Sequence, residues 1–150
     1  PNESSAASDV YKRQTYIQQV KKNASILGEV LMSNGIDIVT GGTDSHMVLV
    51  DLRSKNVTGK DAEESLERAG MTCNKNGVAN DPNPPTITSG IRLGSPAATT
   101  RGIKEEEFKF IGEKISTIIN NLSVSNSDIS MLESSINKEV QDLCSKYPIY

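Results

Sequence analysis

A proline-stiffened stretch from Asn74 to Gly102 constrains the fold of this chain more than any other segment. It holds four of the six prolines and four of the eleven glycines of the chain. Three of these prolines fall within residues 82–85, where each fixes φ and removes a backbone hydrogen-bond donor. Such a segment cannot lie inside a sheet, so the pattern predicts a pre-ordered loop. A short strand with Arg92 near its end, and then a Gly-Ser-Pro turn into a helix, are predicted to follow.

Periodic apolar residues predict the elements on either side of this stretch. A helix is expected over 15–34, ended by Gly35, because glycine adopts the left-handed conformation of a helix C-cap. Strands are expected at 36–40 and 46–52, with the more apolar second strand central. The other predicted elements are a helix at 59–70, a strand at 71–73, a helix beginning at Glu105–Glu107 and a last helix capped near Asp128. This order is typical of an α/β fold with a small, largely antiparallel sheet covered by helices.

The predicted helices must bury apolar faces against that sheet. The expected inward residues of the first and last helices are Tyr16, Ile17, Val20, Ala24, Leu27 and Leu31, and Met131, Leu132, Ile136, Val140 and Leu143. The helix after Gly102 offers a third apolar face from Phe108 to Leu122. Together these faces supply the core of one domain.

Length and charge limit the classes of function. The 150 residues are expected to form one domain over 15–150, preceded by a disordered or non-native tail at 1–14 that is rich in serine and alanine. A net charge of -3 without a basic patch argues against nucleic acid, and no apolar run approaches the ~20 residues of a membrane span. Cys73 and Cys144 are expected to be reduced thiols of a cytosolic protein, and a single histidine argues against a zinc site.

Arg92 is the first candidate functional residue. In a strand, Ile91 and Arg92 point to opposite faces, and Gly90 leaves room for a ligand or another segment to approach. A guanidinium offers a rigid fork of donors that matches a carboxylate. The spacing alone leaves two interpretations open, a carboxylate receptor or a structural, ion-paired or exposed arginine.

The proline-rich loop has a similar pair of interpretations. It is either a rigid connector or a pre-organised wall for a flat ligand, with Asn76 and backbone carbonyls supplying polar contacts. Ser95-Pro96 is interpreted as a helix cap and His46 as a structural histidine, with a general base as the minority alternative. The sequence contains no nucleophile elbow, phosphate loop or Cys/His catalytic pair, which favours a binding or completing domain.

Several ordered motifs then give the chain a resemblance to a known family. They are Val39-Thr-Gly-Gly-Thr-Asp-Ser-His-Met-Val-Leu-Val-Asp-Leu-Arg53, Gly59-Lys60, Asn74-Lys-Asn76, Asn80-Asp-Pro82, Thr88-Ser-Gly-Ile-Arg-Leu-Gly-Ser-Pro-Ala-Ala98, Thr99-Thr-Arg-Gly102 and Lys146-Tyr-Pro-Ile-Tyr150. Over about Tyr16 to Tyr150 the chain closely resembles the C-terminal part of serine hydroxymethyltransferase. The tail at 1–14 does not share the resemblance.

The resemblance implies the two-layer small domain of an aspartate-aminotransferase-like, fold type I enzyme. The complete enzyme is expected to be a cytoplasmic homodimer or tetramer that uses pyridoxal 5'-phosphate. It interconverts serine and glycine and passes a one-carbon unit to tetrahydrofolate, within one-carbon metabolism and glycine biosynthesis. In this family the Schiff-base lysine lies in a large N-terminal domain, and no lysine of this chain matches it. The fragment alone is therefore expected to be inactive, with no catalytic or cofactor-binding residue of its own.

The resemblance also implies roles for particular residues. The family's arginine that clamps the amino-acid carboxylate falls on Arg92, and its folate-site asparagine falls on Asn76. The segment beside the folate pterin falls on Pro84, Pro85 and Thr86. Two alternatives remain, a stand-alone folate- or partner-binding or assembly module, and an aminotransferase small domain, against which the Asn-Lys-Asn and Asn-Asp-Pro motifs argue.

Overall fold

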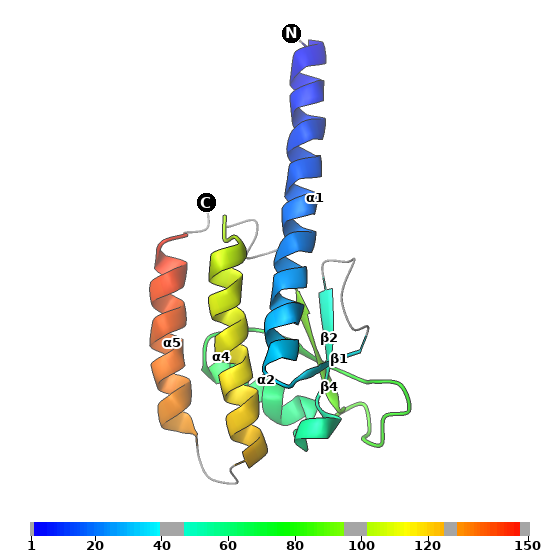
Figure 1. Cartoon of the computed structure of the whole chain (residues 1–150), viewed down its shortest axis with the longest axis vertical. Helices are drawn as coiled ribbons and strands as arrows, with labels where there is room; N and C mark the ends of the chain where they lie inside the picture. The colour runs from blue at the N-terminus through cyan, green and yellow to red at the C-terminus, as the bar shows by residue number, and fades with distance from the viewer. Residues whose placement is uncertain (1, 40–46, 95–101, 125–128, 148–150) are drawn as a thin grey trace.

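The computed structural model describes residues 2–39, 47–94, 102–124 and 129–147, with side chains from Gln14 onward. Within them the chain forms a four-stranded sheet, one face of which is covered by helices (Figure 1). This confirms the predicted α/β fold with a small antiparallel sheet. The predictions for His46, Ser95-Pro96 and Asp128 concern residues outside the described ranges.

The strands follow the order β1-β2-β4-β3, and every neighbouring pair is antiparallel. Their bounds are β1 Asp37–Ile38, β2 Met47–Asp51, β3 Asn74–Asn76 and β4 Gly90–Gly94. β2 lies between β1 and β4, so the prediction of a central second strand is confirmed. Val48 and Val50 of β2 are buried while its alternate residues are half-buried, as expected for a strand covered on one face.

In the described ranges, four helices and a short 3-10 turn accompany the sheet. They are α1 Asn2–Ser33, η1 Arg53–Lys55, α2 Gly59–Arg68, α4 Glu105–Val124 and α5 Ser130–Ser145. α4 packs between α1 and α5, and the three run side by side in Figure 1. At Gly112 a Cβ would lie 2.9 Å from Val30 Cγ1, so glycine lets α4 approach α1 closely.

The first helix differs from the prediction. Residues 2–14, for which the sequence predicts a disordered or non-native tail, are helical and continuous with the rest of α1 (Figure 1). The buried residues of α1, from Val20 to Leu31, anchor it to the fold. Once a helix is anchored, each added residue gains a hydrogen bond without a nucleation cost, so serine- and alanine-rich sequence can extend it. The absence of an apolar period in a segment therefore did not mean the absence of a helix.

Most of the predicted core residues are buried or half-buried, and three are exposed. The described side chains of Tyr16 and Ile17 are 39% and 49% exposed. The first residue of α4, Glu105, pairs with Lys22, and Tyr16 and Ile17 come before Lys22 in α1. Met131 is 88% exposed, although it was predicted to face inward. It lies in the first turn of α5, while Ile136 and Val140 carry the buried stripe of that helix. A contact with the core requires a neighbour in space as well as the right helical phase.

β3 begins at Asn74, three residues after the predicted start. Helix α2 ends in a turn where Gly70 has φ +87° and Met71 N–H donates back to Leu66 O at 2.8 Å. This is the pattern of a glycine-ended helix, and Gly35 ends α1 in the same way, as predicted. The segment after Gly70 therefore leads from the helix to the sheet edge before it pairs.

Cys73 and Cys144 are both free thiols, as predicted. Cys73 is buried, in the segment that joins α2 to β3. Burial raises the pKa of its thiol to about 12, and the negative charges of Glu63 and Glu67 add to the shift. Because the thiolate is the reactive form, Cys73 is a core residue and not a nucleophile.

Candidate functional site: the uncovered face of the sheet

The sheet presents one face that the described helices do not cover, and β4 shows the two faces most clearly. Ile91 and Leu93 are buried toward the helices, whereas Arg92 is exposed on the opposite face. The sequence predicted this alternation from the period of two in a strand. The face that carries Arg92 is therefore accessible within the described chain.

Arg92 lies in the middle of the sheet. Its Cα partners are Leu49 of β2 on one side and Asn74 of β3 on the other. No hydrogen bond or ion pair reaches its guanidinium from the residues that the structure describes. The interpretation as a structural ion pair thus finds no partner among these residues, and the exposed guanidinium offers a rigid fork of five donors.

Asn76 lies on the same face as Arg92. It pairs with Gly90, which is two residues before Arg92 in β4, so the two side chains are diagonal neighbours about 7–8 Å apart. Asn76 is half-buried, and its Nδ2 donates to Gly77 O at 2.9 Å. The amide oxygen of Asn76 takes no part in that hydrogen bond. The structure therefore brings two of the predicted site residues together on one accessible surface.

Gly90 allows the strands β2, β3 and β4 to pack closely beside Asn76 and Arg92. A Cβ at Gly90 would lie 2.7 Å from Val50 O, 2.8 Å from Asn76 O and 2.8 Å from Val78 Cγ1. Real Cβ atoms do not approach backbone oxygens so closely. The room that the sequence predicted beside Arg92 is used by neighbouring segments of the chain rather than left for a ligand.

Pro84, Pro85 and Thr86 form the exposed tip of the proline loop, which we define as residues 77–89. Pro84 O accepts hydrogen bonds from Ile87 N–H and Thr88 N–H, both at 2.9 Å, so the tip is a closed turn. The loop follows β3 and leads into β4, the two strands that carry Asn76 and Arg92. All predicted site residues thus belong to one continuous stretch of the chain, from β3 through the proline loop to β4.

The end of the proline loop is fixed against the start of α2. Gly59 N–H donates to Thr88 O at 3.0 Å and Lys60 N–H donates to Ile87 O at 2.9 Å. These N–H groups are among those a helix leaves unsatisfied at its first turn. A Cβ at Gly59 would clash with the backbone oxygen of Gly90 as well as with Thr88 Oγ1, and would lie 3.1 Å from Ile87 O, so this packing requires glycine. The Gly-Lys pair in the sequence motif therefore secures the loop.

Asp81 holds the beginning of the proline loop to its end, and sequence reasoning missed this residue. Its Oδ2 accepts from Val78 N–H at 3.2 Å and Ser89 N–H at 2.8 Å. Its Oδ1 accepts from Asn83 N–H at 2.9 Å and from the Ser89 hydroxyl at 2.7 Å. The Asp-Pro-Asn segment, which favours a turn in which aspartate accepts from the residue two positions on, was the available signal.

The electrostatics of Asp81 reflect these four bonds. Desolvation by itself raises the pKa of the Asp81 carboxyl. The hydrogen bonds from Asn83, Ser89 and Val78 outweigh it and lower the pKa to about 2. The carboxylate is therefore ionised at neutral pH and is an acceptor for every donor that faces it.

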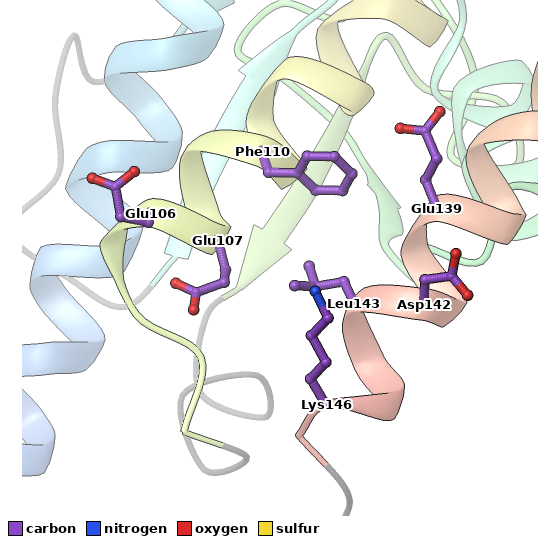
Figure 2. Close-up of a pocket in the computed structure, with 7 residues that line it drawn as sticks. All are labelled: Glu106, Glu107, Phe110, Glu139, Asp142, Leu143 and Lys146. Atoms are coloured by element: carbon purple, nitrogen blue, oxygen red, sulfur yellow. The ribbon is translucent and has the colours of Figure 1, made fainter.

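A groove of about 460 Å³ lies between α4 and α5, apart from the sheet face that carries Arg92 (Figure 2). Its carboxylates are Glu106 and Glu107 of α4, and Glu139 and Asp142 of α5. Figure 2 also shows the ring of Phe110 between the two helices. None of the predicted site residues lines this groove.

Comparison with known proteins decides the family. The sequence profile of the serine hydroxymethyltransferase family matches residues 4–115. The chain belongs to the serine hydroxymethyltransferase family. The match includes most of the segment 1–14, which the sequence analysis left outside the resemblance. The two-layer fold is that of the small domain of a fold type I serine hydroxymethyltransferase.

Individual serine hydroxymethyltransferases extend the match along the chain. The enzyme of Paramagnetospirillum magneticum is 56% identical over 135 residues, and that of Rhodospirillum centenum is 54% identical over 135 residues. The enzyme of Rhizobium rhizogenes is 51% identical over 139 residues. These alignments cover 90%, 90% and 91% of this chain, and 32% of each relative. The chain thus spans about a third of the length of the serine hydroxymethyltransferases it matches.

Among the described residues, no three His, Cys, Asp or Glu side chains are grouped so that they could hold a metal ion. No helix among these residues is long and apolar enough to cross a membrane.

Proposed function

We propose that this chain is the part of a serine hydroxymethyltransferase that orients the amino-acid substrate and forms one wall of the folate site. The complete enzyme interconverts serine and glycine and transfers a one-carbon unit to tetrahydrofolate. The observation that carries the proposal is the exposed Arg92 beside Asn76, on a sheet face that the described helices leave uncovered. The relatives that match the chain at more than half identity carry the same enzyme name.

Arg92 is proposed to bind the carboxylate of serine or glycine. Its backbone is paired on both sides, to β2 and to β3, so the guanidinium projects from a rigid base. A bidentate arginine-carboxylate pair fixes the orientation of the substrate as well as its affinity. That orientation decides which bond of the amino acid lies across the cofactor ring, and holding it lowers the entropic part of the barrier.

The folate site is proposed to include Asn76 and the exposed loop tip, Pro84, Pro85 and Thr86. The two prolines cannot change φ, so they offer a flat apolar surface at little entropic cost. The amide of Asn76 can donate to and accept from a heterocycle. Because Asn76 and Arg92 are diagonal neighbours, a folate bound on this wall lies beside the amino acid that donates the carbon unit.

Pyridoxal 5'-phosphate would be held mainly by the part of the enzyme that this chain does not span. Within the described strands the single lysine is Lys75, whose Nζ lies 3.5 Å from Glu63 and whose backbone N–H donates to the same carboxylate at 2.7 Å. This pairing suits a structural cation and not the Schiff-base lysine of the cofactor. When bound, pyridoxal phosphate supplies an electron sink for bonds broken at the substrate carbon. The proposed role of Arg92 is to hold the amino-acid substrate in position against the cofactor.

Assembly and location complete the proposal. A dimer or tetramer in the cytoplasm is proposed for the complete enzyme. The two free thiols, Cys73 and Cys144, fit a reducing compartment.

A hybrid enzyme tests the proposed function. This chain would replace the C-terminal part of the Paramagnetospirillum magneticum enzyme, and serine-dependent, tetrahydrofolate-dependent glycine formation would be measured. Activity within about tenfold of the unmodified relative is the expected result, since well-matched domains keep the reacting groups positioned. A folded hybrid with bound cofactor and no serine turnover would refute the proposal. Tetrahydrofolate titration of the 150-residue chain addresses the rival assignment, because tight binding without the rest of the enzyme would favour a stand-alone folate-binding module.

A further inference from the structure

The proline loop depends on one carboxylate more than on any other described group. Asp81 accepts from Val78 at the start of the loop, from Asn83 in its middle and from Ser89 at its end. The Ser89 hydroxyl, which donates to Asp81, also accepts from Asn83 Nδ2 at 2.8 Å. Asn83 Nδ2 reaches Thr88 O at 3.3 Å as well. These bonds form a closed network inside the loop.

We propose that Asp81 is a positioning residue that holds the folate wall at a fixed place relative to Arg92. This inference rests on the proposed function, because it assigns the loop tip to folate and Arg92 to the amino acid. Ser89 directly precedes β4, which carries Arg92, and Asn83 directly precedes the tip. The Asp81 carboxylate bonds to both, so the network spans the distance between the two ligand sites.

The two ligand sites depend on Asp81 to different extents. Arg92 is held by backbone pairing with Leu49 and Asn74, and these pairs do not involve Asp81. The part of the loop before its tip has no strand partner, and its hydrogen bonds to other described residues lead mainly to Asp81 and Ser89. Loss of Asp81 should therefore move the folate wall and leave the arginine in place.

Asp81→Asn is the sharpest substitution because it keeps the shape of the side chain. Every donor that faces the carboxylate is an N–H group except for the Ser89 hydroxyl. Whichever way the amide is turned, its NH₂ group faces at least one backbone N–H, and that donor loses its acceptor. Ser89→Ala removes one of the four hydrogen bonds to Asp81 and also the bond from Asn83 Nδ2 to the Ser89 hydroxyl, and it leaves the other three bonds to the carboxylate. Asp61→Asn, at an exposed carboxylate in the first turn of α2, is the matched control for the change of charge.

The kinetic test uses the hybrid enzyme described above. Asp81→Asn is expected to raise the KM for tetrahydrofolate about tenfold while the KM for serine changes less than about twofold. Ser89→Ala should give the same split with a smaller rise, and Asp61→Asn should leave both KM values unchanged. A purely structural role would lower the active fraction without this split. Equal rises in the KM values for tetrahydrofolate and serine, or no change in either, would overturn the proposal. If Asp81→Asn does not fold, the KM values of Ser89→Ala decide the proposal by the same criterion.

Hydrogen exchange in the 150-residue chain separates this proposal from the proposed function. Asp81→Asn should speed exchange of the Val78, Asn83 and Ser89 amides at least about tenfold, while the paired amides of β2 and β4 keep their protection. Unchanged exchange within the loop would refute the role of Asp81, whatever the hybrid enzyme does. An inactive unsubstituted hybrid would refute the proposed function, and the exchange data would still decide whether Asp81 holds the loop.

Discussion

The strand that carries Arg92 and the proline loop that precedes it are adjacent in sequence, yet they are held in different ways. β4 pairs with β2 on one side and β3 on the other, through backbone groups that every residue but proline has. The proline loop is held by particular side chains, above all Asp81 and Ser89, and by the first N–H groups of α2. Arg92 can therefore change without cost to the fold, whereas the loop depends on the identity of a few residues.

The largest expected effect concerns the fit of β4 between its neighbours. Gly90→Ala places a Cβ within 2.8 Å of two backbone oxygens, Val50 O and Asn76 O, which cannot move without separating the strands. The substitution should lower the free energy of unfolding by about 3 kcal/mol, as overpacking of a rigid site does. Urea denaturation followed by circular dichroism measures it.

Gly77→Ala is the control for this change, because a Cβ there meets Asp81 Oδ2 at an ordinary 3.8 Å. It should alter stability by less than about 0.5 kcal/mol. If Gly90→Ala and Gly77→Ala lowered the free energy of unfolding equally, the strand β4 would be no more rigid than the proline loop.

Arg92→Lys is expected to separate function from stability. An exposed side chain whose guanidinium has no partner among the described residues can be replaced with less than about 0.5 kcal/mol of change in unfolding free energy. In the hybrid enzyme the loss of the bidentate clamp should cost about 1.5–3 kcal/mol per lost charged hydrogen bond, measured as kcat/KM for serine.

Arg53→Lys is the matched control, since Arg53 is an exposed arginine already paired with Asp51, at 2.7 Å, and with Ala79 O, at 3.3 Å. It should leave kcat/KM for serine within about twofold. Normal serine turnover in Arg92→Lys would show that Arg92 does not bind the substrate carboxylate.

The dependence of the loop on Asp81 predicts a difference in acid stability. The pKa of Asp81 is lowered from its ordinary 3.8 to about 2 in the folded protein, so its stabilising contribution is complete above the ordinary pKa. That contribution is lost as the pH falls through this interval. The unsubstituted chain should therefore lose more stability between about pH 4.5 and pH 2 than Asp81→Asn does.

Asp51 titrates in both proteins, and its pKa is lowered chiefly by the hydrogen bond from Arg53. The charge of Asp81 raises that pKa, so the contribution of Asp51 cancels only in part in this comparison. Parallel stability curves for the two proteins, measured by thermal melting at each pH, would show that the bonds to Asp81 do not stabilise the fold.

The smallest effect is expected at the loop tip. Thr86 is exposed and its side chain is not among the groups that hold the loop. Thr86→Ala should leave stability within about 0.5 kcal/mol and raise the KM for tetrahydrofolate less than about threefold. A larger loss of stability than that of Ser89→Ala would place the anchor of the loop at its tip rather than at the Asp81 network.

Local sequence patterns determined the elements whose cause is local. Glycines 35 and 70 end their helices because they alone adopt positive φ there without strain, and both are visible as glycines after a periodic segment. The alternation that buries Ile91 and exposes Arg92 follows from the period of a strand. The motifs around Asn76 and Arg92 predicted the family, and the comparison with known proteins confirmed it.

The tertiary structure decided what depends on distant neighbours. Residues 2–14 are helical because α1 is anchored further along the chain, and Met131 is exposed although its helical phase predicted burial. The role of Asp81 is likewise set by the loop that brings Ser89 back to it across eight positions. A sequence pattern fixes the direction of a side chain relative to its own backbone. Its hydrogen-bond and packing partners are determined only when separate segments come together in the fold. That is why Arg92 was a candidate from the sequence, whereas the carboxylate that holds the loop beside it became visible only in the fold.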